Sequence, residues 1–344
     1  MLNNVCRLGA FGAVVLSLGL APAAGQDTKR PWLDPTLLAA AQKEGPLVVY
    51  SSMNEQEGLP LFKIFTAATG IKVDYVRGSD TQLMGRTAIE FRTKLKAWDI
   101  IQTTTINKMP PPMVAQIDLS EGKALNADAI APDRRWYGMY ANYNGPAYNT
   151  KLVKPEELPK TYEEFLTKKQ WAKRVAIDGT DNEWLKAMFV HFGEQRATEL
   201  IKGIVATLNP VVTDGHLALA RATGAGEYAI SLNNYVNLSM NVKLAGGPID
   251  VWAMDPVALM FGQVGVSALA PNPNAAKLAA NFMISQEAQQ FIAKFGRLPT
   301  RSDVADNPPG TVAMLQQKKV IPVLLTPEEE KVWQRRFQEL FRPR

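Results

Sequence analysis

Hydrophobic and polar positions alternate along the chain in a way that predicts strands followed by helices. Residues 47–50 form a short apolar run, and residues 61–68 carry apolar side chains at helical spacing before Gly70. The same succession repeats with a strand at 71–76 and a helix through 84–95, and residues 98–102 predict a third strand. Strands that alternate with helices at such short intervals predict a parallel, doubly wound α/β sheet.

A second α/β unit follows in the middle of the chain. Residues 174–177 predict a strand, residues 184–191 a helix, and residues 228–232 another strand. The last helix begins with Thr326 and Glu329, which have the spacing of a capping box, and its apolar face is typical of a packed terminal helix. The pattern therefore predicts two α/β units.

The first 25 residues have the organisation of a secretory signal peptide. Arg7 precedes an apolar run at residues 8–20, and small residues follow as far as Gly25. A membrane anchor is less favoured, because the run is shorter than the ~20 residues that span a bilayer. Cys6 is the only cysteine among 344 residues and precedes the run. We therefore expect a periplasmic mature protein that is unlipidated and has neither disulfides nor a thiol nucleophile.

Composition and charge argue against a nucleic-acid partner. The chain is 46% hydrophobic and 21% charged, which is typical of a soluble globular protein. Lys and Arg number 38 against 33 Asp and Glu, a net charge of +5, yet the densest basic cluster is the short stretch 331–336. A small surplus without a basic stripe or a nucleic-acid motif does not indicate DNA or RNA binding.

The sequence contains no recognisable catalytic constellation. His191 and His216 are the only histidines, and neither has metal-ligand spacing to another strong ligand. Ser51 and Ser52 follow a strand, as a nucleophile would, but no Gly-x-Ser-x-Gly motif surrounds them. The acidic residues within 178–183 lack the pattern of a calcium loop. We therefore predict no enzymatic activity, no cofactor and no metal, with a periplasmic serine hydrolase as a less favoured alternative.

Polar loops between a strand and a helix recur in both units. They carry three Ser/Thr-x-x-Glu/Gln spacings: Ser52 with Glu55, Ser79 with Gln82, and Thr180 with Glu183. Helix N-termini at the carboxyl ends of strands form the edge where open α/β sheets bind ligands, and they favour anions. Arg77 adds a positive charge beside one of these loops. Capping boxes occur in many helices, however, so the spacing alone does not establish a ligand site.

Several stretches resemble the periplasmic solute-binding proteins of ABC transporters. They are residues 265–273 (GVSALAPNP), 275–277 (AAK), 281–285 (NFMIS), 296–299 (GRLP) and the predicted crossover 145–150 (GPAYNT). The resemblance covers nearly all of the mature chain. It is most specific to the branch of extracellular solute-binding family 1 that includes ferric-iron-binding proteins.

The resemblance implies a type II two-lobe periplasmic-binding-protein fold with two crossover segments at the hinge. We expect a signal peptide at 1–25, one lobe from 27–135 plus 252–300, and the other from 138–250 plus 301–344. Solute would be held between the lobes of a monomer and delivered to an ABC permease and its ATPase in the inner membrane.

The chain departs from this branch at the positions that hold iron. Two adjacent tyrosines follow Asn-Asn in the iron-binding relatives, whereas this chain has Tyr235 and then Val236. The relatives' histidine and carboxylate correspond to Asn54 and Thr104. Fe³⁺ prefers anionic oxygen donors, and one phenolate with Asn and Thr supplies too little charge. Iron bound through Tyr235 therefore remains an alternative to an organic solute.

The sequence predicts a small polar solute, anionic or zwitterionic, bound at the edge where the loops meet. Asp178 suits an anion poorly and would cap its own loop or contact the amine of a zwitterion. The predicted ligand-binding residues are Ser51, Ser52, Asn54, Arg77, Ser79, Thr104, Asp178, Thr180, Asn233 and Tyr235.

Overall fold

The computed structural model describes residues 30–342, and the predicted signal peptide with Cys6 lies outside them. The strands are β1 (Leu47–Ser51), β2 (Val73–Arg77), β3 (Ile100–Thr103), β4 (Tyr137–Asn149), β5 (Val175–Asp178), β6 (Val211–Thr213), β7 (Ile230–Tyr235), β8 (Ile249–Val251), β9 (Val257–Val266) and β10 (Val320–Pro322). The α-helices are α1 (Pro35–Ala41), α2 (Glu55–Thr69), α3 (Asp80–Arg92), α4 (Asn182–Phe192), α5 (Glu194–Leu208), α6 (His216–Ala225), α7 (Val236–Leu244), α8 (Pro273–Met283), α9 (Gln286–Ala293), α10 (Thr311–Gln316) and α11 (Pro327–Phe341).

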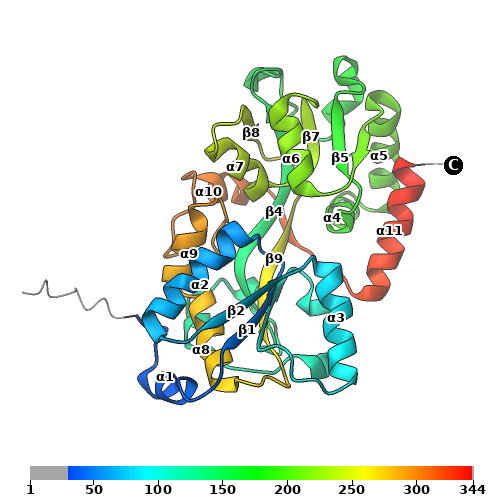
Figure 1. Ribbon diagram of the computed structural model, residues 1–344. Helices are drawn as coiled ribbons and strands as arrows, with labels where there is room; N and C mark the ends of the chain where they lie inside the picture. The colour runs from blue at the N-terminus through cyan, green and yellow to red at the C-terminus, as the bar shows by residue number, and fades with distance from the viewer. Residues whose placement is uncertain (1–29, 343–344) are drawn as a thin grey trace, which may run out of the picture. The chain divides into compact units, whose positions relative to one another are not determined.

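The strands hydrogen-bond in the order β2-β1-β3-β9-β4-β7-β5-β6, with β10 on β9 and β8 on β4 (Figure 1). β1 pairs in parallel with β2 and β3, so that Val49 lies opposite Tyr75 and Ile100. β5 pairs in parallel with β6 and β7. These pairings confirm the two doubly wound α/β units. β9 runs antiparallel to β3 and β4, which local periodicity does not reveal.

Two long strands connect the two units. β4 has 13 residues and β9 has 10, and every residue of both is buried. The predicted crossover at 145–150 lies at the end of β4, where this strand pairs with β7 and β8. Figure 1 shows β4 and β9 running from the level of β1 and β2 to that of β5 and β7. They are the crossover segments of the two-lobe fold.

The two units have separate hydrophobic cores. The first contains Trp32, Phe65 and Phe282, whose rings pack on one another with centroids 4.8–6.0 Å apart. The second contains Trp184 and Phe341, and α11 packs into it as the sequence predicts. Burial of these large rings in two clusters stabilises each unit independently. The lobe boundaries given above stay a prediction.

Helix starts differ from the sequence prediction at two of the three loops. Ser79 and Gln82 form the predicted capping box of α3. Ser52 does not cap α2, because its N–H still donates to the carbonyl of Gln102 in the neighbouring strand, and the helix starts only after Asn54. Thr180 does not cap α4, because Asp181 accepts the Trp184 N–H in its place.

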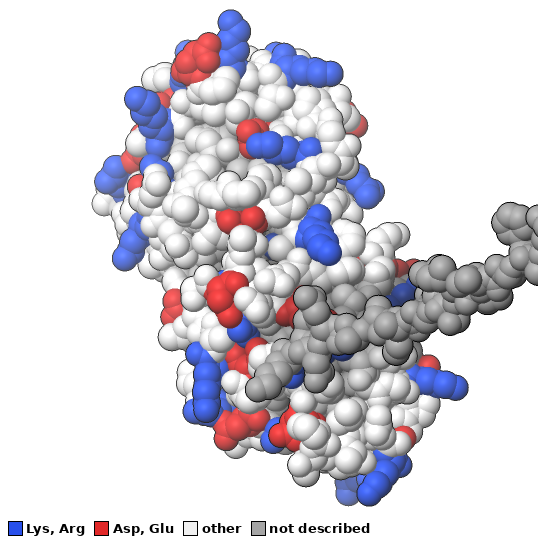
Figure 2. Space-filling model, turned by 90° about the vertical axis from the view of Figure 1, so that its left-hand side faces the viewer, with Lys and Arg blue, Asp and Glu red and all other residues white. Residues whose placement is uncertain are grey.

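Charged side chains are interspersed on the surface. On the face in Figure 2, basic and acidic residues alternate wherever the grey atoms leave it visible, and no patch of one sign forms. Within the described part of the chain, no helix combines the length and apolar character that crossing a membrane requires. The interspersed surface charges agree with the lack of a basic stripe in the sequence.

Candidate functional site

Polar side chains gather where three neighbouring strands end. Asp178 is the last residue of β5, His216 begins the helix that follows β6, and Asn233, Asn234 and Tyr235 complete β7. Because β5, β6 and β7 are parallel, their carboxyl ends lie at one edge of the sheet. We call this group, together with Asp181, the Asp178–Tyr235 site.

The Asn233 side chain links β7 to β5 and to the loop after β5. Its Oδ1 accepts the N–H of Asp178 at 2.8 Å. Its Nδ2 donates to the Asp178 carbonyl at 3.1 Å and to Asp181 Oδ2 at 3.3 Å. Both ends of the amide are therefore engaged with β5 and the loop after it. The predicted ligand residue Asn233 thus fixes the backbone of Asp178 and orients the carboxylate of Asp181.

The carboxylates of Asp178 and Asp181 are both fully buried. Asp178 Oδ1 accepts from the N–H and the hydroxyl of Thr180, whereas Oδ2 has no hydrogen-bond partner. Asp181 Oδ1 caps α4, and its Oδ2 accepts from Asn144 and Asn233. Asn144 Oδ1 and Asn182 Oδ1 are also buried without partners. The site thus has unused hydrogen-bond acceptors.

His216 and Tyr235 stack face to face at the site, with ring centroids 3.8 Å apart and an angle of 20°. His216 Nδ1 lies 3.2 Å from Asn234 Oδ1 and 3.9 Å from Asp178 Oδ2. Its Nε2 lies 4.0 Å from Asp181 Oδ2. Since Asn234 Oδ1 can only accept, Nδ1 carries the proton of a neutral ring and Nε2 is free to accept.

Burial and neighbouring charge shift three pKa values at the site. Burial raises the pKa of Asp181 well above its usual range, and the charges of Glu183 and Asp178 raise it further. The pKa of Tyr235 is raised well above 10 by burial and then by Asp181 and other carboxylates. Burial lowers the pKa of His216 despite the nearby Asp178. The site therefore disfavours both a phenolate and an imidazolium.

One carboxylate of the first unit lies close enough for its charge to act on this site. The charge of Asp80, at the start of α3, contributes to the raised pKa of Tyr235. Thr103 and Thr104 donate their hydroxyls to the two oxygens of Asp80. Thr104 therefore holds a carboxylate that faces the site.

Lys108 lies in the short 3₁₀ helix Ile106–Lys108 and links the units by two ion pairs. Its Nζ is 3.4 Å from Glu183 Oε1 and 3.1 Å from Glu330 Oε2. Glu183 belongs to α4 and Glu330 to α11, so Lys108 brings the two units into contact.

Of the ten residues predicted to bind ligand, Asp178, Thr180, Asn233 and Tyr235 come together, and Thr104 contacts Asp80 opposite them. Ser51 is buried and donates to Gln102 Oε1 at 2.6 Å. Arg77 is exposed at the end of the edge strand β2. No hydrogen bond or ion pair among the described residues connects Ser51, Ser52, Asn54, Arg77 or Ser79 to the Asp178–Tyr235 site. All ten assignments of a ligand-binding role stay predictions.

Sequence reasoning missed Asp80, Asp181, His216 and Asn234. His216 comes after β6 with two residues between them, but this strand has only three residues and gives no periodic signal. Asp181 lies in the acidic stretch 178–183, whose spacing argues only against a calcium loop. Its place as the N-cap of α4 provides the signal that could have found it.

We expect His216 to titrate below pH 6.5, because burial disfavours its imidazolium. The groups that face it are Asp178, Asp181, Asn234 and Tyr235. NMR of the two histidine side chains measures this directly, and His191→Gln assigns the signals, since His191 is exposed on α4. A midpoint for His216 above 6.5 would contradict the described electrostatics.

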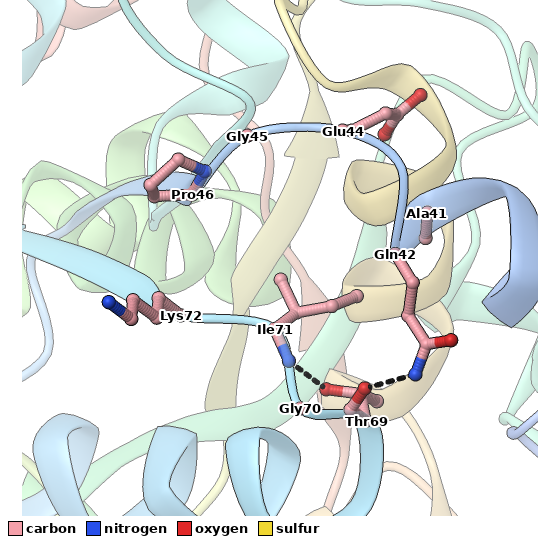
Figure 3. Close-up of a pocket in the computed structure, with 9 residues that line it drawn as sticks. All are labelled: Ala41, Gln42, Glu44, Gly45, Pro46, Thr69, Gly70, Ile71 and Lys72. Atoms are coloured by element: carbon pink, nitrogen blue, oxygen red, sulfur yellow. Dashed lines mark hydrogen bonds between the residues drawn. The ribbon is translucent and has the colours of Figure 1, made fainter.

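A cavity of about 380 Å³ lies elsewhere, at the amino ends of β1 and β2. It is lined by the connections that precede these strands, including Gln42, Thr69 and Ile71. Gln42 Nε2 donates to the Thr69 carbonyl at 2.8 Å, and the Ile71 N–H donates to Thr69 Oγ1 at 3.1 Å (Figure 3). These groups join α1 to the end of α2, so the cavity lies at a structural junction apart from the Asp178–Tyr235 site.

Comparisons with known proteins agree with the fold. A family model described as bacterial extracellular solute-binding protein matches residues 88–321. Iron uptake protein A1 of Synechocystis sp. is 27% identical over 308 residues, 83% of each chain. A putative 2-aminoethylphosphonate-binding periplasmic protein of Salmonella typhi is 28% identical over 261 residues, 71% of this chain and 74% of the relative.

A solved structure shows the same architecture. The substrate-binding protein of an ABC transporter from Agrobacterium tumefaciens superposes with a TM-score of 0.71 at 18% identity, covering 87% of this chain and 96% of its own. This likeness confirms the two-lobe periplasmic-binding-protein fold that the sequence predicts.

Proposed function

Since the chain belongs to the bacterial extracellular solute-binding proteins, we propose that it captures a small organic solute at the Asp178–Tyr235 site for an ABC import system. The observation that carries this proposal is that both units contribute residues to one site. Asp178, His216 and Tyr235 come from the second unit, and Asp80 faces them from the first. Binding between two lobes couples capture to closure about the crossover strands.

A ferric ion is the second candidate, because one relative is an iron uptake protein. The site supports it less well than an organic solute. Val236 replaces the second tyrosine and is fully buried at the start of α7. Residues 30–342 contain no group of three His, Cys, Asp or Glu side chains placed to hold a metal ion.

The geometry gives no support to a serine hydrolase. The Ser51 hydroxyl is buried and donates to Gln102, and no histidine contacts it among the described residues. His216 pairs instead with Asn234 and Tyr235. The family consists of solute-binding proteins, and we propose that this member returns its solute unchanged.

The remaining parts of the proposal follow from this role. The protein would work in the periplasm after cleavage of the signal peptide. It would act as a monomer that docks on a membrane permease driven by an ATPase. The relatives named for the periplasm and for an ABC transporter support this placement.

Mass spectrometry tests the proposal. The protein is purified from the periplasm without denaturation, then unfolded, and the released small molecules are identified. We expect one intact polar solute at near-equal molar amount. Re-adding that solute to the refolded protein should return it unchanged after prolonged incubation. Recovery of a cleaved product would show that the protein is a hydrolase and not a carrier.

A further inference from the structure

We propose that the Asp178–Tyr235 site binds the primary ammonium group of an organic solute, with Asp178 Oδ2 as its main partner. This inference rests on the proposed carrier function and names the class of its solute. It favours the amine of a zwitterion or a diamine over a purely anionic solute.

Most of the buried hydrogen-bonding atoms without partners in and next to the site are acceptors, and the donor among them is Asn237 Nδ2, two residues after Tyr235. Asp178 Oδ2, Asn144 Oδ1 and Asn182 Oδ1 are buried without partners. His216 Nε2 is a further acceptor on a ring that lies between Asp178 Oδ2 and Asp181 Oδ2, 3.9 and 4.0 Å from them. A primary ammonium carries three donors and no acceptor, so it complements this set. An anionic group would add acceptors where acceptors already predominate.

The two buried carboxyl groups also favour a cation. Asp178 and Asp181 are fully buried, and among residues 30–342 only the neutral His216 lies within ion-pair distance of either. Lys108 is engaged by Glu183 and Glu330. A buried carboxylate without a positive partner is strongly unfavourable, and a bound ammonium removes that penalty.

An ammonium fits the surroundings better than a metal ion does. Asp181 Oδ2 already accepts from two amides, which leaves one free carboxylate oxygen on Asp178. The other groups around the site are amide oxygens and the aromatic rings of Tyr235 and His216. The Tyr235 and His216 rings supply π faces, which attract ammonium groups.

A thermal-shift panel with matched pairs of compounds tests the inference. The probes are 2-aminoethylphosphonate against ethylphosphonate, and putrescine against 1,4-butanediol, with fructose 6-phosphate and ferric citrate as solutes of other classes. We expect an amine to raise the melting temperature of the full mature protein, while its counterpart without the amino group does not. Titration calorimetry then gives the affinity for that amine.

Asp178→Asn removes the charge and keeps the shape of the side chain. We expect it to weaken binding of the stabilising amine by about 10- to 100-fold, as for a hydrogen bond to a charged group. The matched control is Asp118→Asn, which removes a carboxylate from an exposed ion pair with Arg134 and should change the affinity less than about 2-fold.

A second variant keeps the test decisive if Asp178→Asn folds poorly. Thr180 is exposed, and its hydroxyl donates to Asp178 Oδ1. Thr180→Ala should fold normally and weaken amine binding by roughly 3- to 10-fold, because Asp178 is less well oriented.

Three results would overturn the inference: no amine stabilises the protein, an amine and its counterpart bind equally, or Asp178→Asn binds the amine as the wild type does. If fructose 6-phosphate or ferric citrate alone stabilises the protein, the carrier function stands and the ammonium site is wrong. If the mass spectrometry above finds a cleaved product, the carrier function itself is wrong.

Discussion

Gly262→Ala is expected to lower the free energy of unfolding by about 3 kcal/mol or more. Gly262 lies in β9 opposite Tyr140 of β4. A Cβ at this position would lie 2.1 Å from Tyr140 Cζ and 2.4 Å from Cε2. The ring cannot move aside easily, because it is buried, contacts the Arg297 guanidinium, and has its hydroxyl bonded to Gln102.

Gly85→Ala is the matched control. Gly85 lies on the exposed side of α3, where an added Cβ meets nothing within 4 Å. We expect this substitution to be neutral or to stabilise by ~0.5–1 kcal/mol, since alanine favours helix more than glycine does. Chemical denaturation of both variants checks the pair. Equal stability of the two variants would contradict the packing described between β4 and β9.

Tyr235→Ala is expected to weaken binding of the stabilising amine by roughly 100-fold. The substitution removes the ring that stacks on His216 at 3.8 Å, and with it the outer π face of Tyr235 and the support of the His216 ring. Tyr235→Phe keeps that face and removes only the hydroxyl, so we expect a loss of at most about 10-fold. Calorimetric titration of both variants with the same amine measures the difference.

The same pair of variants separates an organic solute from iron. A ferric ion bound through the Tyr235 phenolate would be lost as completely in Tyr235→Phe as in Tyr235→Ala. Equal loss in the two variants, together with stabilisation of the wild type by ferric citrate, would identify the protein as an iron carrier.

Local periodicity predicts β1, α2, β2, α3 and β3 because each has its own apolar pattern and a helix or turn signal at its end. Gly70 ends α2 in the left-handed conformation, with φ of 73°, as the sequence indicates. The strands β6, β8 and β10 have three residues each, too few for any period to appear. The position of β9, antiparallel between β3 and β4, depends on contacts between residues far apart in the chain. Local sequence patterns therefore do not predict it.

The site was predictable to the extent that its residues end recognisable strands. Asp178, Asn233 and Tyr235 meet this condition, and they lie together. Ser51 meets it too, but its hydroxyl is used within the first unit by Gln102. Position after a strand places a residue at the right edge of the sheet. It does not reveal which group the side chain will bind. For this reason the sequence does not identify Asp80 and His216 as site residues.

The most direct test is the structure of the protein with the stabilising amine bound. The account predicts that the amine nitrogen lies within hydrogen-bond distance, ~2.7–3.2 Å, of Asp178 Oδ2, beside the stacked rings of His216 and Tyr235. A solute bound instead against Arg77 and the Ser51–Asn54 loop, with its amine directed away from Asp178, would contradict it.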